Sequence, residues 1–213
     1  MRRIFTTRRG GVSKAPYDSF NLGGGVGDDP PAVSANRARL AAAAGLPTDR
    51  VVWMRQVHGV TVSTVSAADP TGSAATTLPD SDGVVTTVSG LGLAVLVADC
   101  VPILAADPVA GVIAAVHAGR RGAAAGIGVR TIEQMVAAGA AVGSIEVLLG
   151  PAICGDCYEV PGLMRDEVDA ALPGSASTTG AGTPGLDLRA GLARQFGDLG
   201  VADVAIDMRC TYA

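Results

Sequence analysis

The sequence predicts an α+β fold, a single layered domain in which helices flank a mixed β-sheet. Short apolar, β-branched runs alternate with amphipathic or alanine-rich runs of helical period along the 213 residues. The strand-like runs occur both side by side and between helices, which favours a mixed sheet over a strict alternation of parallel strands and helices. No internal repeat or linker divides the chain, so residues 1–213 are expected to form one domain.

The elements are expected in the following order. A helix runs from Pro31 to Ala44, because Gly45 and Pro47 stop it. Strands follow at Val51–Val57, Val60–Val65, Gly83–Thr87, Leu93–Ala98, Ile103–Ala106 and Val112–Val116. A long helix, a buried strand, two helices and a last strand complete the chain: Ala123–Ala138, Ile145–Leu149, Leu163–Leu172, Leu188–Leu199 and Val204–Met208. The segment Gly174–Gly185, rich in glycine, serine and threonine, is expected to be a flexible loop.

Composition and charge exclude several classes of protein. The net charge of −4 argues against a general binder of nucleic acid or of a membrane surface. The most apolar stretch, Leu91–Ala106, is interrupted by Asp99 and Pro102, so no membrane-spanning helix is expected. The first residues carry arginines without an apolar core of a signal peptide. We therefore expect a cytoplasmic protein with reduced thiols, and a monomer.

The two histidines of the chain and one cysteine form a candidate metal site. His58, Cys100 and His117 each stand at the end of an expected strand, where open sheets gather functional groups. Imidazole and thiolate suit zinc, and three protein ligands with an open fourth position are typical of a catalytic zinc site. Asp99 and Gln56 are the candidates to orient an imidazole through its other nitrogen. The alternative is that these residues are polar or small side chains near the core.

The remaining cysteines carry a weaker pattern. Cys154 and Cys157 form a single CxxC, without a second pair or a neighbouring histidine in the sequence. We interpret them as two thiols in a tight turn, because a lone CxxC is a weak zinc or redox signal. Cys210 adds no further pattern.

Two segments are candidates for binding an anion. Gly119-Arg120-Arg121-Gly122 joins a strand to a helix, and such a turn offers free N–H groups beside guanidinium groups. Arg8 belongs to a basic N-terminal cluster that can receive phosphate or form a solvated arm. Asn21 begins a glycine-rich turn that can bring backbone close to a ligand or be a plain loop. We assign Arg8, Asn21, Gln56 and Arg121 as candidates for binding substrate or phosphate.

A series of motifs resembles the YfiH family, whose members were named after laccases and are regarded as purine nucleoside phosphorylases or peptidoglycan-editing factors. The resemblance covers essentially the whole chain and rests on Thr7–Ser13, Pro16–Tyr17, Ser19–Leu22, Gln56–Gly59, Asp80–Gly83, Ala98–Pro102, His117–Gly122, Gly150–Ile153 and Tyr158–Val160. It implies a single α+β domain with a mixed sheet. It also implies that His58, Cys100 and His117 are the catalytic metal ligands.

The resemblance implies a zinc-dependent phosphorolysis of adenosine, inosine, guanosine or methylthioadenosine, with adenosine deaminase activity also ascribed to the family. Zinc is expected rather than copper, because two histidines cannot hold the several coppers of a multicopper oxidase. The chain departs from the family in two places. Arg120 stands where a tryptophan is usual, and the chain stops at Ala213, before a C-terminal stretch that carries an arginine of the family's site.

Two other functions stay open. Cys100 and His117 could form the thiolate–imidazolium pair of a hydrolase that acts in peptidoglycan precursor editing. A binding protein without catalytic activity is the third possibility, favoured if the missing C-terminal stretch abolishes turnover. A zinc site of the cytidine-deaminase type is not supported, because the chain lacks a His-x-Glu followed by Pro-Cys-x-x-Cys.

Overall fold

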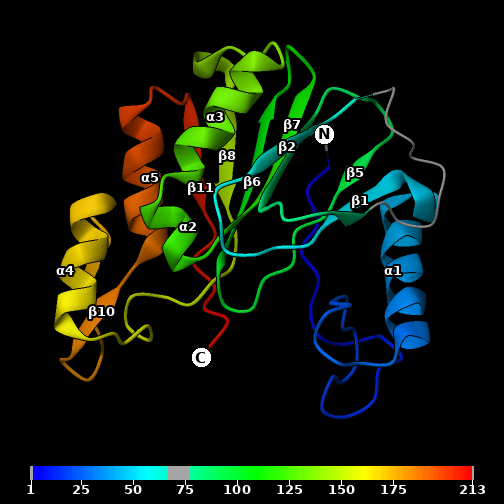
Figure 1. Ribbon diagram of the computed structural model, residues 1–213, viewed down its shortest axis with the longest axis horizontal. Coiled ribbons are helices and arrows are strands. Elements are labelled where there is room, and N and C mark those ends of the chain that lie inside the picture. Colours follow the sequence, from blue (N-terminus) through cyan, green and yellow to red (C-terminus); the bar gives the residue numbers. More distant parts are fainter. Residues whose placement is uncertain (1, 67–76, 213) are drawn as a thin grey trace.

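A six-stranded mixed sheet stands at the centre of the computed structural model, which describes residues 2–66 and 77–212 (Figure 1). Its strand order is β11-β8-β6-β7-β4-β2, with β11 parallel to β8, β4 parallel to β2 and the other neighbours antiparallel. These strands are β2 Val62–Val65, β4 Gly83–Thr86, β6 Val101–Asp107, β7 Val112–Ala118, β8 Glu146–Leu149 and β11 Asp203–Ile206. The expected α+β fold with a mixed sheet is confirmed.

Two smaller sheets and the helices surround this central sheet. A parallel three-stranded sheet has the order β3-β1-β5, and β9 pairs with β10 in an antiparallel hairpin. Their bounds are β1 Val51–Met54, β3 Thr77–Leu78, β5 Gly92–Leu93, β9 Ala176–Thr178 and β10 Pro184–Leu186. The helices are α1 Pro30–Ala44, α2 Arg120–Ala124, α3 Ile127–Ala137, α4 Gly162–Ala171 and α5 Leu188–Asp198, with short 3-10 turns at Thr48–Arg50 and Val142–Ser144.

Alternation along the central strands separates two hydrophobic cores, because successive side chains of a strand point to opposite faces. Val85 of β4 and Ala114 of β7 belong to the core that α3 and α5 cover. Their neighbours Val84 and Ala115 belong to a second core, which the three-stranded sheet closes through Val52 and other residues. Both faces of the central sheet are therefore buried.

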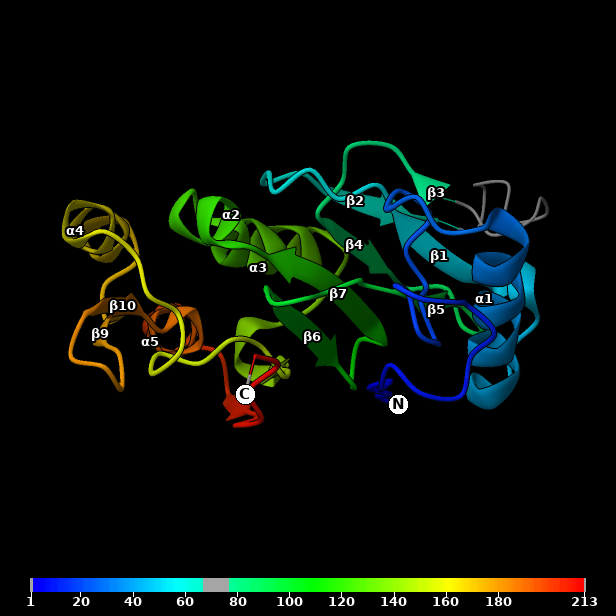
Figure 2. The ribbon, with the colours of Figure 1, turned by 90° about the horizontal axis from the view of Figure 1, so that it is seen from below.

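The helix α1 forms the outermost layer, on the far side of the three-stranded sheet (Figure 2). Val51 and Trp53, which alternate with the side chains of the second core, pack here with Ala41 of α1. The guanidinium of Arg37 lies 4.1 Å from the centroid of the Trp53 ring. The buried Asn36 accepts from the N–H of Val12 and donates through its amide nitrogen, so α1 also holds the N-terminal segment.

The long helix expected at Ala123–Ala138 is in fact two helices. α2 ends at Ala124 and α3 begins at Ile127, and Gly126 between them has a φ of +91°. Glycine adopts this left-handed conformation without the penalty that a side chain would meet, so it breaks the helical period that the sequence suggests. The expected start was also late, because α2 already begins at Arg120.

The strand expected at Leu93–Ala98 was wrong for most of its length. Only Leu93 lies in β5, and Ala94 still donates its N–H to the carbonyl oxygen of Val52. Further along, the side chain of Gln56 replaces a strand partner, since its Oε1 accepts from the N–H of Leu96 at 2.9 Å and its Nε2 donates to the Leu96 oxygen at 2.7 Å. The segment is extended and apolar but pairs with a side chain instead of a strand.

The expected flexible loop Gly174–Gly185 contains the hairpin of β9 and β10 instead. Its turn is closed by the hydroxyl groups of Thr179 and Thr183, whose oxygens lie 2.6 Å apart. Asp169 of α4 accepts from the N–H groups of Gly174 and Ala176 at 2.9 Å each and so holds the approach to the hairpin. The small polar residues that suggested flexibility here make local hydrogen bonds.

The other expected elements are confirmed within two or three residues at each end, and β3 was not expected at all. Among the described residues, no helix is both long enough and apolar enough to cross a membrane.

Candidate functional site

His58, Cys100 and His117 come together where the central strand β6 begins and β7 ends, although 42 residues separate the first two. One ligand atom from each lies within 4.8 Å of the others. The Cys100 Sγ is 3.8 Å from the Nε2 of His58, and the two imidazole rings meet edge to face with centroids 4.6 Å apart. We call these three residues the His–Cys–His cluster.

Strand register explains why two members of the cluster meet. β6 and β7 are antiparallel, with Val101 opposite Ala118 and Pro102 opposite His117. Cys100 directly precedes β6, so this register places it beside Gly119 at the end of β7. The expectation that each residue ends a strand needs correction here: Cys100 stands at the start of β6, and His117 lies within β7.

His58 reaches the cluster from the turn between β1 and β2, with a φ of +61°. This left-handed conformation is uncommon for a residue with a side chain and persists where the surroundings enforce it. The enforcing group is Asp82, whose buried carboxylate accepts the N–H groups of Val57, His58 and Gly59 at 3.2, 2.9 and 2.8 Å. One carboxylate therefore shapes the whole turn.

Asp82 also accepts from the Nδ1 of His117 at 2.8 Å, and its own carbonyl oxygen accepts from the N–H of His117. It directly precedes β4, which pairs with β7 through Gly83 and Val116. Sequence reasoning named Asp99 and Gln56 for this orienting role and missed Asp82. The signal was present in the Asp80–Gly83 motif, but only the β4–β7 pairing places that motif beside His117.

The electrostatics of the pair favour a neutral imidazole on a charged carboxylate. Burial raises the pKa of Asp82, yet the hydrogen bonds from His117 and from the three N–H groups outweigh it, and the net pKa is lowered. Burial lowers the pKa of His117, and the hydrogen bond to Asp82 offsets this only in part. We therefore assign the His117 proton to Nδ1, which leaves the lone pair of Nε2 to bind a metal.

Gly119 forms the wall of the cluster. A Cβ built at this position would lie 2.6 Å from Cδ2 of His58, 3.1 Å from Sγ of Cys100 and 3.5 Å from Cε1 of His117. Only a residue without a side chain leaves the three ligands room to converge. The donor set, the oriented His117 and this clearance fit a zinc ion, so the cluster can hold a metal.

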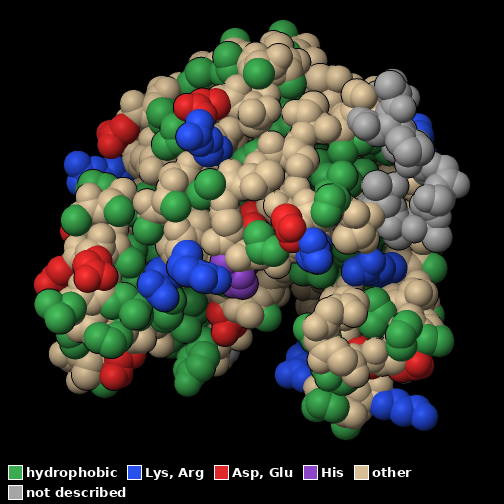
Figure 3. Space-filling view, viewed as in Figure 1, with side chains coloured by type: hydrophobic (Ala, Val, Ile, Leu, Met, Phe, Trp, Pro, Cys, Tyr) green, Lys and Arg blue, Asp and Glu red, His purple; other side chains and the backbone are tan. Residues whose placement is uncertain are grey.

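The cluster opens to the surface on one side. His58 is exposed and Cys100 half-buried, whereas His117 is buried. Figure 3 shows histidine atoms at the head of an open notch, with Lys or Arg side chains beside them. Arg120 and Arg121 directly follow Gly119, and Arg121 is exposed. α2 has five residues, so the anion expectation rests on these guanidinium groups more than on a helix dipole.

The other expected binding residues lie in local hydrogen-bond networks. Gln56 is engaged with Leu96, as described above. Asn21 donates to Asp28 Oδ2 at 2.9 Å and accepts from the N–H of Gly23. The exposed Arg8 donates to the carbonyl oxygen of Asp18. Among the contacts of the described residues, none joins Arg8 or Asn21 to the cluster, and their roles in binding stay predictions.

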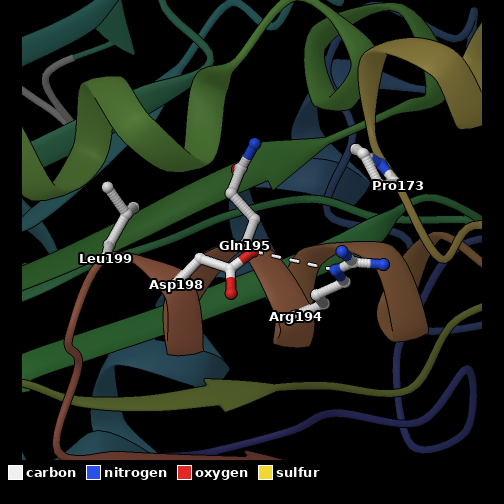
Figure 4. A pocket seen from close by; sticks show the side chains of 5 residues that line it. All are labelled: Pro173, Arg194, Gln195, Asp198 and Leu199. Carbon is white, nitrogen blue, oxygen red and sulfur yellow. Dashed lines mark ion pairs between the residues drawn. The ribbon is translucent and has the colours of Figure 1, made fainter.

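Two hollows elsewhere on the described surface are separate from the cluster. One of about 220 Å³ lies along α5, where the ion pair of Arg194 and Asp198 crosses its wall (Figure 4). The other, of about 360 Å³, lies between the N-terminal segment and the start of α1. No cluster residue lines either of them, so the open notch remains the place where a substrate can reach the cluster.

Comparison with known proteins gives consistent results. Residues 2–213 match the family model described as multi-copper polyphenol oxidoreductase laccase. The chain is 60% identical over all its 213 residues to a purine nucleoside phosphorylase of Mycobacterium tuberculosis, 83% of whose length is matched. It is 53% identical over 207 residues to a purine nucleoside phosphorylase of Streptomyces griseus, covering 97% of this chain and 83% of that one.

Solved structures agree with the sequence matches. The Bacillus licheniformis hypothetical protein YfiH superposes with a TM-score of 0.87 at 28% identity, covering 97% of this chain and 81% of that one. YlmD from Geobacillus stearothermophilus gives a TM-score of 0.86 at 36% identity, covering 97% and 80%. The chain belongs to the multi-copper polyphenol oxidoreductase laccase family, the family of YfiH.

Proposed function

We propose that this protein is a purine nucleoside phosphorylase that acts at the His–Cys–His cluster. The observation that carries the proposal is the 60% identity, over the whole chain, to a relative named purine nucleoside phosphorylase. The proposed substrates are adenosine, inosine, guanosine or methylthioadenosine together with phosphate. The products are the free base and the corresponding ribose 1-phosphate.

The reaction exchanges one bond for another at the anomeric carbon of the ribose. A phosphate oxygen forms a bond to this carbon while the bond to the purine nitrogen breaks, and the base leaves with the electron pair and takes up a proton. Positive charge develops on the sugar, so groups that hold the phosphate anion against it stabilise the transition state. We assign the phosphate to Arg121, with Arg8 as the alternative and Gln56 and Asn21 as further candidates for contacting substrate.

Zinc is the proposed cofactor, held by Nε2 of His58, Sγ of Cys100 and Nε2 of His117. When bound to three protein ligands, zinc supplies a positive charge that can bind or polarise an oxyanion. His117 is the fixed member, because Asp82 holds its ring from the opposite nitrogen. His58 lies at the surface, so it and Cys100 form the side of the cluster that a nucleoside can approach.

The test incubates the zinc-loaded protein with inosine or adenosine, with and without phosphate, and follows free base and ribose 1-phosphate by chromatography. We expect base release that requires phosphate and is lost in His58→Ala and in His117→Ala. Tyr17→Phe serves as the matched control, because the Tyr17 hydroxyl donates to the Val26 carbonyl oxygen and no contact of the described residues joins it to the cluster. Base release that persists in both histidine variants would show a contaminating enzyme and overturn the proposal.

Adenosine deaminase activity is a second proposed reaction at the same cluster. It converts adenosine and water to inosine and ammonia, so it needs no phosphate and leaves the glycosidic bond intact. The same chromatogram separates inosine from free adenine and therefore distinguishes the two reactions. Inosine formation without added phosphate, lost in His58→Ala, is the result that supports it.

The Cys/His hydrolase is the alternative from another class. Burial and the charges of Asp99 and Asp82 raise the pKa of the Cys100 thiol, which disfavours a free thiolate–imidazolium pair. The sulfur also lies against His58, not only near the expected His117. Amide hydrolysis that survives a metal chelator would favour this alternative. If the protein holds no metal and turns over no nucleoside, a binding protein without catalytic activity is favoured.

We also predict that the protein is a cytoplasmic monomer without nucleic-acid partners.

A further inference from the structure

A second group of three candidate metal ligands, all of them thiols, lies apart from the His–Cys–His cluster. Cys154, Cys157 and Cys210 place their Sγ atoms within 4.8 Å of one another, and all three side chains are half-buried. Among the described residues, no disulfide joins them. The sequence showed only the CxxC pair, because Cys210 follows 53 residues after Cys157 and reaches it only through the fold.

We propose that Cys154, Cys157 and Cys210 form a second metal site, which takes a zinc ion through three thiolates. A tetrahedral zinc about 2.3 Å from each sulfur sets the sulfurs about 3.8 Å apart, so Sγ atoms that lie within 4.8 Å of one another need to approach by at most about an ångström. Among the described residues no further His, Cys, Asp or Glu joins the group, so water or a ligand from solution takes the fourth position.

The CxxC side of the site is held rigidly before any metal binds. The N–H of Cys157 and that of Tyr158 both donate to the carbonyl oxygen of Cys154 at 3.0 Å, which closes the turn. Gly155 at its tip approaches the hairpin so closely that a Cβ would lie 2.6 Å from the Ser177 hydroxyl oxygen. Two ligands presented by a fixed turn lose little conformational entropy on binding.

The Cys210 side is held by a different set of contacts. Cys210 forms a parallel bridge with Ala152, just before the CxxC turn, and Thr211 donates its N–H to the Ala152 oxygen at 3.2 Å. Figures 1 and 2 both show the C-terminal segment running beside the loop that follows β8. Backbone pairing with Ala152 therefore brings the Cys210 thiol to the CxxC turn.

A buried positive charge lies next to this segment. Arg189, 2% exposed, donates through Nη1 to the carbonyl oxygens of Asp207 and Arg209 at 2.6 and 3.1 Å. Its Nε and Nη2 have no hydrogen-bond partner within the described part of the chain. Through its two hydrogen bonds to carbonyl oxygens, Arg189 fixes the backbone that leads to Cys210.

The proposed zinc ion would link Cys210 in the C-terminal segment to Cys154 and Cys157 in the loop after β8. That segment also touches the neighbourhood of Cys100, since the Thr211 hydroxyl donates to Asp99 at 2.6 Å and the Ile153 N–H donates to the Asp99 oxygen at 3.0 Å. The second site would therefore stabilise the contacts that hold Asp99, the residue before Cys100 of the His–Cys–His cluster. Its role is structural, and it does not require that the proposed phosphorylase reaction be correct.

The experiment uses the full chain, reduced under anaerobic conditions, stripped with a chelator and reloaded with zinc or with cobalt as a spectroscopic substitute. Wild type should bind about two zinc ions per chain, and Cys210→Ser and Cys154→Ser about one each. The matched control Cys100→Ser should also bind about one and keep the intense thiolate-to-cobalt absorption of a three-sulfur site. Far-ultraviolet circular dichroism checks that each variant is folded.

Two results would overturn the second site. One is a wild type that binds at most one zinc ion, all of it lost in Cys100→Ser. The other is a reduced chain in which thiol-reactive dye labels Cys154, Cys157 and Cys210 equally fast with and without zinc. Phosphorolysis measured on the same samples separates the two proposals, because the second site can fail while the reaction persists, and the reverse.

Discussion

At the scale of single residues, Asp82 connects more of the candidate site than any of the three ligands does. Its carboxylate receives three backbone N–H groups from the His58 turn and the Nδ1 of His117. It thus holds one histidine by its backbone and the other by its ring. A carboxylate is needed for both tasks, because its two oxygens accept all four hydrogen bonds, whereas an amide has one oxygen and turns an NH2 donor toward the other N–H groups.

Asp82→Asn is therefore expected to weaken zinc binding at the His–Cys–His cluster by about 10- to 100-fold and to lower phosphorolysis with it. Competition with a metal indicator measures the affinity, and chromatography of free base measures the activity. Asp80→Asn is the matched control, because Asp80 is exposed and, among the described residues, forms its ion pair with Arg55. Equal zinc affinities for the two variants would contradict the role assigned to Asp82.

Gly119→Ala tests the clearance around the cluster. The added methyl group would lie 2.6 Å from a ring carbon of His58, so the ring must move. Ordinary van der Waals contact needs about 3.4 Å or more, so the ring must move by roughly 1 Å, and such a displacement at a reacting centre is expected to cost on the order of 100-fold in phosphorolysis rate. Gly143→Ala, whose Cβ would meet nothing within 4 Å, serves as the control. Retained activity in Gly119→Ala would show that the three ligands need not converge.

At the scale of elements, two strand pairings assemble the site. The β6–β7 hairpin brings Cys100 beside His117, and the β4–β7 pairing brings Asp82 to the same imidazole.

The other end of the β6–β7 hairpin is closed by the buried Asp107. Its carboxylate accepts from the N–H groups of Val109, Ala110 and Ala141 at 2.9 to 3.0 Å. These hydrogen bonds lower the pKa of Asp107, with burial opposing them in part.

A lowered folded-state pKa means that Asp107 stabilises the fold above the ordinary aspartate pKa of about 4 and that this contribution is lost as pH falls further. The urea midpoint of wild type is thus expected to drop between pH 5 and pH 3 more than that of Asp107→Asn. Asp107→Asn should also be less stable at neutral pH. Asp203→Asn, which changes an exposed carboxylate, is the control. Parallel pH profiles for wild type and Asp107→Asn would contradict the assignment.

At the scale of the whole molecule, zinc should act as a stabilising ligand. Binding to the folded state alone adds about 2.7 kcal/mol at 100 times the dissociation constant, roughly 5–10 °C in Tm for a chain of this size. Differential scanning calorimetry with chelator and with buffered free zinc measures the shift. The double variant Cys100→Ser/Cys210→Ser should show no shift. A wild-type Tm that does not depend on zinc would argue against both metal sites.

Local pattern was sufficient for most of the architecture. Helix α1 was expected almost to its ends, since alanine-rich sequence before Gly45 and Pro47 leaves few alternatives. The pattern failed at Gly126, where backbone conformation breaks a continuous helical period, and at Leu93–Ala98, where the side chain of Gln56 takes the place of a strand. Both failures come from single residues whose effect depends on what lies nearby in space.

The chemistry of the site followed from the residue types, because a chain with two histidines and a cysteine at apolar run ends offers few ways to bind a metal. Their convergence, the choice of Asp82 over Asp99 and Gln56, and the approach of Cys210 to the CxxC turn could not follow from the order of residues. Each depends on the register of paired strands or on contacts between distant segments. Residue identity limits which atoms can act as ligands, and long-range packing determines which of them meet.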